Sequence, residues 1–173
     1  MKTTLTTLGV SLLIFASCAG QKKAESNFIQ DNIDNAVAQH TLQTDIIEKS
    51  GKILNPRTIE KDGSIHYVPI DDWCSGFFPG NMWLTYELTG DQKWEKLAEK
   101  YTEDLDSVKH LKWHHDVGFM IGCSYLNGYR LAGKTEYKDV IVEAAKSLST
   151  RFRPGAGVIQ SWDADKGWQG TRG

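Results

Sequence analysis

The sequence predicts an all-α fold built from repeated helical hairpins. The segment YELTGDQKW at 86–94 aligns with YRLAGKTEY at 129–137, with a constant offset of 43 residues. The segments that precede them, FFPGNMWLTYEL and FMIGCSYLNGYRL, are apolar or small nearly all round, so we expect helices covered on both sides. Covered inner helices inside a ring of half-buried outer helices would form a toroid of hairpins. A stacked solenoid is the alternative.

The second helix of each hairpin should have one apolar face and one wet face. Its apolar residues recur at i, i+3, i+4, i+7 and i+11, the spacing of one helical face. The two stripes are Trp94, Leu97, Ala98, Tyr101, Leu105 and Tyr137, Val140, Ile141, Ala144, Leu148.

The N-terminal residues predict an export signal rather than part of the fold. Residues 1–18 place one lysine before an apolar stretch and then small residues, which is typical of a secretory signal. The letters IFASC resemble a bacterial lipobox, so Cys18 is expected to become the lipidated N-terminus. A plain signal peptide with an incidental cysteine is the alternative. Residues 19–26 would then form a short flexible tether, and the protein would reach the cell envelope, as a periplasmic or outer-membrane lipoprotein.

Residues 27–173 should hold the folded domain. Apolar residues at helical spacing predict a helix over 27–50, ending at Gly51. Glycine and proline interrupt residues 51–72, where IHYVPI suggests a short extended segment.

Composition excludes two classes of protein. The net charge of −2 offers no clustered basic face for nucleic acid. A mean hydropathy of −0.42 and the lack of a run of about 20 apolar residues exclude a polytopic membrane protein. Contact with a membrane is therefore expected only through the N-terminal lipid.

Three loops carry four of the six tryptophans. These loops are DDWCSGFFPG, WHHDVGF and IQSWDADKGWQG, and the repeat places all three at the same end of the inner helices. A tryptophan ring stacks well on the C–H face of a sugar, while its N–H can reach a hydroxyl. The bland alternative is that the rings plug the end of the bundle. The last loop superficially resembles a calcium loop, but its Gly167 stands where that pattern has Asp or Asn, so we interpret it as a turn.

Asp116 stands at the start of an apolar run, within WHHDVGF. It could be a reacting group, a metal ligand or a helix cap. His110 and His114 have the i, i+4 spacing of metal ligands on a helix, but Gly118 and the apolar run place them at a helix start. We therefore expect no metal and no cofactor.

Cys74 and Cys123 lie in different repeats. An oxidising compartment would permit a disulfide between them, but two buried free thiols are the preferred interpretation. Nothing in the sequence marks either thiol as an activated nucleophile.

The blocks DWCSGFFPGNMWLTYELTGD and HHDVGFMIGCSYLNGYRLAG, followed by QSWD, resemble the unsaturated glucuronyl hydrolases, glycoside hydrolase family 88. The resemblance implies an (α/α)6 barrel, of which this chain holds under half. It implies Asp116 as a catalytic residue and Trp73, His115 and Trp162 as substrate contacts. The second aspartate of the family would lie beyond Gly173, so we expect this chain alone to be inactive.

The resemblance also implies the chemistry. Such enzymes remove a 4,5-unsaturated uronic acid from the non-reducing end of oligosaccharides left by polysaccharide lyases. A carboxylic acid protonates C4 of the C4=C5 double bond, and water adds at C5. The alternatives are an unsaturated rhamnogalacturonyl hydrolase that acts on pectin fragments, and a non-catalytic surface lipoprotein that binds glycans.

Overall fold

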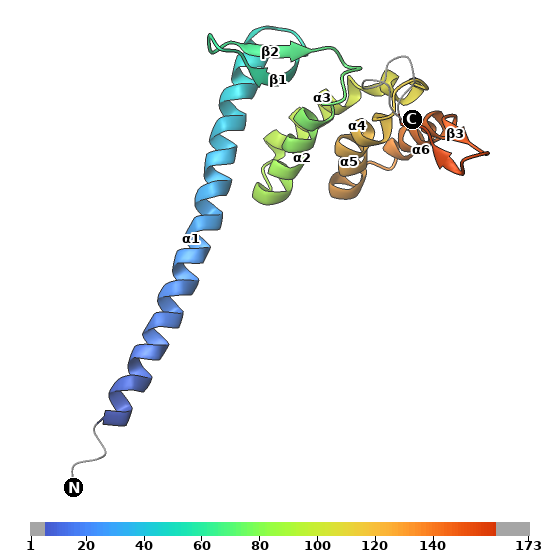
Figure 1. Ribbon diagram of the computed structural model, residues 1–173. Coiled ribbons are helices and arrows are strands. Elements are labelled where there is room, and N and C mark those ends of the chain that lie inside the picture. Colours follow the sequence, from blue (N-terminus) through green and yellow to red (C-terminus); the bar gives the residue numbers. More distant parts are fainter. Residues whose placement is uncertain (1–5, 162–173) are drawn as a thin grey trace. The chain divides into compact units, whose positions relative to one another are not determined.

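The computed structural model describes the chain from residue 6 to residue 161, and its side chains from residue 27 (Figure 1). The chain divides into two compact units, residues 1–45 and 46–173. The first helix, α1 (Thr6–Lys49), makes up the first unit and continues into the second. It ends one residue short of the expected boundary. Gly51 follows with a φ of 66°, a left-handed conformation that suits glycine at a helix end.

The division of the chain at residues 18 and 26 stays a prediction. Helix α1 passes through both boundaries in the uncleaved chain. Signal cleavage would remove the first part of that helix, so its course does not test where the mature protein would begin.

A β hairpin follows α1 in the second unit. Strands β1 (Asn55–Ile59) and β2 (Ile65–Val68) pair antiparallel, with a register shift between Pro56 and Thr58. The expected extended segment at IHYVPI is thus confirmed as β2 and gains a partner strand. Gly63, with a φ of 87°, sits in the turn that joins the two strands.

The first helical hairpin consists of α2 (Phe77–Thr89) and α3 (Gln92–Glu103). Gly90 ends α2 with a φ of 68°, and the Asp91 carboxylate caps α3 by accepting from the Lys93 N–H. The outer stripe is confirmed, because Trp94, Ala98 and Tyr101 of α3 are fully buried against the rest of the unit.

A short 3-10 helix, η1 (Asp106–His110), leads to the second hairpin. The first helix of that hairpin is divided into α4 (Val117–Cys123) and α5 (Tyr125–Ala132), whereas the sequence predicted one helix. The break lies at Ser124, which is fully buried and whose hydroxyl donates to the Met120 carbonyl at 2.8 Å. A serine that bonds back to residue i−4 often bends a helix.

Helix α6 (Tyr137–Ser149) completes the second hairpin. It begins after Gly133, whose φ is 66° at the end of α5. Two very short strands, β3 (Phe152–Arg153) and β4 (Val158–Ile159), then form a hairpin that the sequence did not predict. In Figure 1 the two helical hairpins stand next to each other, with α2 and α5 as their inner members and α3 and α6 as their outer ones.

The sequence predicted inner helices that are covered on both sides, but the described residues show one side of them exposed. Leu84 and Leu88 of α2 are 43% and 58% exposed, and Leu126 of α5 is 45% exposed. Helices α3 and α6 pack against the inner helices, and the exposed leucines show that, among residues 46–161, no further helix covers the other side. These exposed faces are those of an open arc of hairpins, in which the next hairpins of a ring would supply the missing contacts.

Candidate active site

Two glycines, one just before α2 and one within it, allow α4 to pack closely against this helix. A Cβ atom on Gly76 would lie 2.3 Å from the Met120 carbonyl oxygen, and one on Gly80 would lie 2.9 Å from that of Cys123. Side chains at these positions would hold the two backbones apart. Since residues 76 and 80 are one helical turn apart, the motif SGFFPG gives α2 a smooth face on which α4 lies.

Asp116 occupies the position before the first turn of α4, but its carboxylate makes no capping hydrogen bond. Its Oδ2 lies 3.0 Å from Nε2 of His115 instead. The side chains of Asp116 and His115 are 32% and 21% exposed, so both reach solvent. The cap, as a complete account of Asp116, is therefore not supported. The acid is held by its histidine neighbour and is open to a ligand.

His114 helps to hold Asp116 in place through a hydrogen bond to the backbone. It is 9% exposed, and its Nδ1 accepts the backbone N–H of Asp116 at 3.0 Å. Its ring stacks on that of His115, with centroids 5.6 Å apart. A backbone N–H can only donate, so the neutral imidazole of His114 must carry its proton on Nε2.

Burial lowers the pKa of His114 below the ordinary value of 6.5. The nearby carboxylates of Asp116, Asp71 and Asp72 act in the opposite direction, and His115 acts with the burial. Burial prevails, which favours the neutral ring that the hydrogen bond requires. These electrostatic neighbours also show that the loop of Asp71 and Asp72 lies beside WHHD.

The residues that could hold a metal differ from the histidine pair that the sequence spacing indicated. His114, His115 and Asp116 place one ligand atom each within 4.8 Å of one another. Among the described residues His110 is not in this group, because η1 ends there and helical spacing no longer applies. The hydrogen bond from the Asp116 N–H to His114 and the ion pair between His115 and Asp116 account for this closeness without an ion, and we assign no metal to the group.

An exposed aromatic cluster lies next to Asp116. Trp73, Phe77 and Phe119 are 43%, 37% and 44% exposed. The ring of Phe77 meets those of Trp73 and Phe119 edge-on, at centroid distances of 5.7 and 4.9 Å. The backbone N–H of Phe119 donates to the Asp116 carbonyl, so the acid and one of the three aromatic residues share the first turn of α4. The sequence pointed to Trp73 but to neither phenylalanine, although Phe77 follows Trp73 by four residues and stands at the start of α2.

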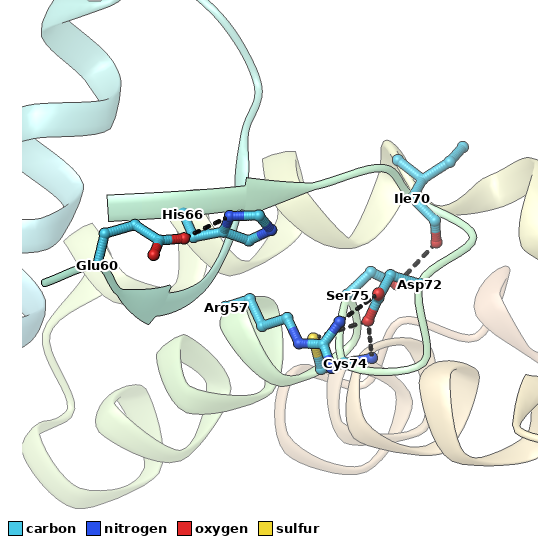
Figure 2. A network of polar contacts seen from close by, with 7 residues as sticks. All are labelled: Arg57, Glu60, His66, Ile70, Asp72, Cys74 and Ser75. Carbon is cyan, nitrogen blue, oxygen red and sulfur yellow. Dashed lines mark hydrogen bonds and ion pairs between the residues drawn. The ribbon is translucent and has the colours of Figure 1, made fainter. Parts of the chain in front are cut away.

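A polar network, drawn in Figure 2, ties Asp72, the residue before Trp73, to Arg57 of the β hairpin. Arg57 reaches from β1 to Asp72, with Nη1 and Oδ2 3.0 Å apart, and its guanidinium lies 6.0 Å from the Trp73 ring centroid. Asp72 also accepts from the backbone N–H and the thiol of Cys74, while Ser75 donates to the Ile70 carbonyl. The β hairpin thereby holds the tryptophan loop in place.

The same network sets the ionisation of its members. Burial alone would raise the pKa of Asp72, but the hydrogen bonds from Cys74 and the charges of Arg57 and His114 outweigh it and lower that pKa. Burial and the Asp72 carboxylate raise the pKa of Cys74 to about 11. Both Cys74 and Cys123 are free thiols, as preferred from the sequence, but only Cys74 is buried, and Cys123 is half-buried instead of buried as expected. Cys74 is not an activated nucleophile.

Known proteins of similar sequence carry two function names, unsaturated glucuronyl hydrolase and unsaturated chondroitin disaccharide hydrolase. This chain is 44% identical over 103 residues to the unsaturated glucuronyl hydrolase of Formosa agariphila, a match that covers 59% of this chain and 26% of that protein. A crystal structure described as an unsaturated glucuronyl hydrolase specific for heparin matches with a TM-score of 0.62 and 41% identity, over 64% of this chain and 30% of that one. The chain is related to the unsaturated glucuronyl hydrolases.

A third relative is the unsaturated chondroitin disaccharide hydrolase of Streptococcus pneumoniae, 30% identical over 136 residues. That match covers 75% of this chain and 33% of the relative. The chain therefore spans about a quarter to a third of the length of the relatives that it matches. No family model matches the chain. The predicted fold, helical hairpins of an (α/α)6 barrel, is confirmed by the solved structures of unsaturated glucuronyl hydrolases that the chain matches.

The site residues expected from the unsaturated glucuronyl hydrolases are brought together in part. His115 and Asp116 pair at the start of α4, and Trp73 approaches that helix through Phe119, whose ring lies 6.3 Å from its own. Trp162 lies outside the described residues. Trp113, from the second tryptophan loop, is 53% exposed and its ring lies 4.9 Å from that of His114.

Proposed function

We propose that this sequence supplies the Asp116 side of the active site of a glycoside hydrolase that acts on lyase-generated oligosaccharides. The substrate is an oligosaccharide, of glycosaminoglycan type, with a 4,5-unsaturated uronic acid at its non-reducing end. The observation that carries the proposal is the uncapped Asp116 carboxylate, held by His115 beside the exposed rings of Trp73, Phe77 and Phe119. The names of the relatives support this substrate class.

The geometry fits hydration of the C4=C5 double bond. Trp73 offers a ring face for the unsaturated sugar. Asp116, as a carboxylate, stabilises the positive charge that develops on the ring once C4 is protonated. It also raises the pKa of a second carboxyl group placed opposite, which keeps that group able to donate a proton. His115 binds Asp116 and faces solvent, so it is placed to contact the substrate.

A chimera tests the proposal. Residues 46–161 of this chain replace the matched segment of the Formosa agariphila relative, and turnover is followed by loss of the ultraviolet absorbance of the conjugated enoate. We expect turnover of unsaturated glycosaminoglycan disaccharides and little of pectin-derived ones. Preference for pectin fragments would instead indicate a rhamnogalacturonyl hydrolase. Saturable binding without turnover, in a chimera that folds, would indicate a glycan-binding protein.

The chain alone serves as a second arm of this test. The family resemblance places the second carboxylate beyond residue 173, so residues 19–173 alone should leave the absorbance unchanged. Turnover by this chain at the rate of the chimera would show that its own residues suffice, and would overturn the assignment of roles.

We also propose that the protein is exported and carries lipid on Cys18. The support is the order of one lysine, an apolar stretch and the letters IFASC in residues 1–18. In the part of the chain that the structure describes, no helix combines the length and the apolar character that crossing a membrane would require. The lipid would then be the anchor, with the catalytic domain held outside the membrane.

A further inference from the structure

The side chain of Arg151 joins two loops that are far apart in the sequence. Arg151 is only 5% exposed. Its Nη1 donates to the Trp113 carbonyl at 2.7 Å, while Nε and Nη2 donate to the carbonyls of Gln160 and Ser161 at 2.8 and 3.0 Å. One guanidinium thus contacts the main chain of WHHD and the main chain that leads to Trp162.

We propose that Arg151 is a positioning residue. It holds the loop at Trp113 and the segment at Gln160 and Ser161 in a fixed position relative to each other. The backbone adds to the side-chain contacts, because the Gln160 N–H donates to the Arg151 carbonyl at 2.9 Å, extending the β3–β4 ladder by one residue pair. The position of Arg151 is therefore fixed by the small β hairpin. From there its planar fork reaches across to Trp113, three residues before Asp116.

Lysine cannot replace Arg151 in this role. A guanidinium has five N–H donors in a rigid plane, so it can bind carbonyls on two sides at once. An ammonium group has three donors at a single point and cannot span them. Arg153, two residues later, makes the matched control. It donates to the side chain of Gln160 at 2.7 Å and lies on the exposed part of the same hairpin.

Amide hydrogen exchange on the 173-residue chain tests the inference without any need for activity. The probes are the Asp116 N–H, bonded to His114, and the Gln160 N–H, bonded to Arg151. In Arg151→Lys both amides should exchange about tenfold faster, the scale of losing a hydrogen bond to a charged group. Amides of α2 and α3 should keep their rates, as should both probes in Arg153→Lys.

Two measurements keep the test decisive if a variant folds poorly. In the unmodified chain at low urea, the Asp116 and Gln160 amides should open with the same urea dependence, since they belong to one unit. In Arg151→Ala, added guanidinium ion should slow the exchange of both amides again, whereas ethylammonium should not.

Three results would overturn the inference: faster exchange at Gln160 alone, equal acceleration in α2 and α3, or separate openings in urea. The consequence for catalysis rests on the proposed function. In the chimera, Arg151→Lys should lower kcat more than it raises KM, because it displaces the Asp116 loop. A chimera without turnover would refute the proposed function and leave the exchange result standing.

Discussion

At the scale of single residues, Asp116 is a carboxylate placed where a helix cap is expected, yet its side chain bonds to His115 instead. A structural role and a role of the charge can be separated, because asparagine keeps the shape of aspartate and suits the position before a helix equally well, but carries no charge. Asp116→Asn should therefore leave the free energy of unfolding within about 1 kcal/mol of the original. In the chimera kcat should fall by about 10²- to 10⁴-fold, with KM little changed.

Asp106→Asn is the control for this charge change. Asp106 lies in η1, is 53% exposed and pairs only locally with Lys109, so its loss should not alter turnover. If Asp116→Asn kept the original kcat, the carboxylate would be reduced to a local structural role and the catalytic interpretation of WHHDVGF would fail.

His114 predicts how stability depends on pH. Its pKa is below 6.5 in the folded protein because the ring is buried, whereas the unfolded chain titrates near 6.5. The folded state then binds fewer protons, so its stability is fully present above pH 6.5 and falls as the pH drops from 6.5 through the folded pKa. Burial also lowers the pKa of His40 in α1, so this residue adds a pH dependence of stability with the same sign.

His114→Asn isolates the first contribution, since an asparagine oxygen can still accept the Asp116 N–H. Urea unfolding at pH 5 and pH 7.5 should show a smaller difference for this variant than for the original chain. NMR titration of the imidazole should place the midpoint of His114 below 6.5. A midpoint above that value would contradict the assigned burial and its bond to Asp116.

At the scale of the elements, the contact between α2 and α4 depends on the absence of side chains. In Gly76→Ala the new methyl group would meet the Met120 backbone, so we expect a loss of about 1–3 kcal/mol in the free energy of unfolding. Gly122→Ala is the matched control within α4. A Cβ there meets nothing within 4 Å, and the change should add up to about 1 kcal/mol. Urea midpoints of the two variants should move in opposite directions.

The elements also show what a sequence can and cannot predict. The outer stripe of Trp94, Ala98 and Tyr101 follows from helical periodicity, because burial repeats with the turn of the helix. Periodicity also places the loops at one end, and with them Trp73 and Asp116. It says nothing of Arg151, whose acceptors are main-chain carbonyls that any residue possesses. Nor does it predict the break at Ser124, which depends on one hydroxyl turning back toward the backbone.

At the scale of the whole molecule, the prediction concerns where the protein goes. Covalent lipid gives an N-terminus its affinity for a membrane, so Cys18→Ala should abolish fatty-acid labelling and move the protein to the soluble fraction. Cys123→Ala is the control, because that thiol lies inside the folded unit and should leave labelling intact. Labelling that persists in Cys18→Ala would mean that the lipobox was misidentified.

The hydrogen bond from the Cys74 thiol to Asp72 affects how this cysteine would react in an oxidising compartment. Burial and the Asp72 carboxylate raise the pKa of Cys74 to about 11, so the thiol stays protonated at pH 7, whereas it is the thiolate that oxidants and disulfides attack. In the proposed oxidising compartment, Cys74 would therefore stay unpaired beside Trp73 with little tendency to form a mixed disulfide. The carboxylate that holds the tryptophan loop in shape thus adds to burial in keeping its neighbouring thiol protonated.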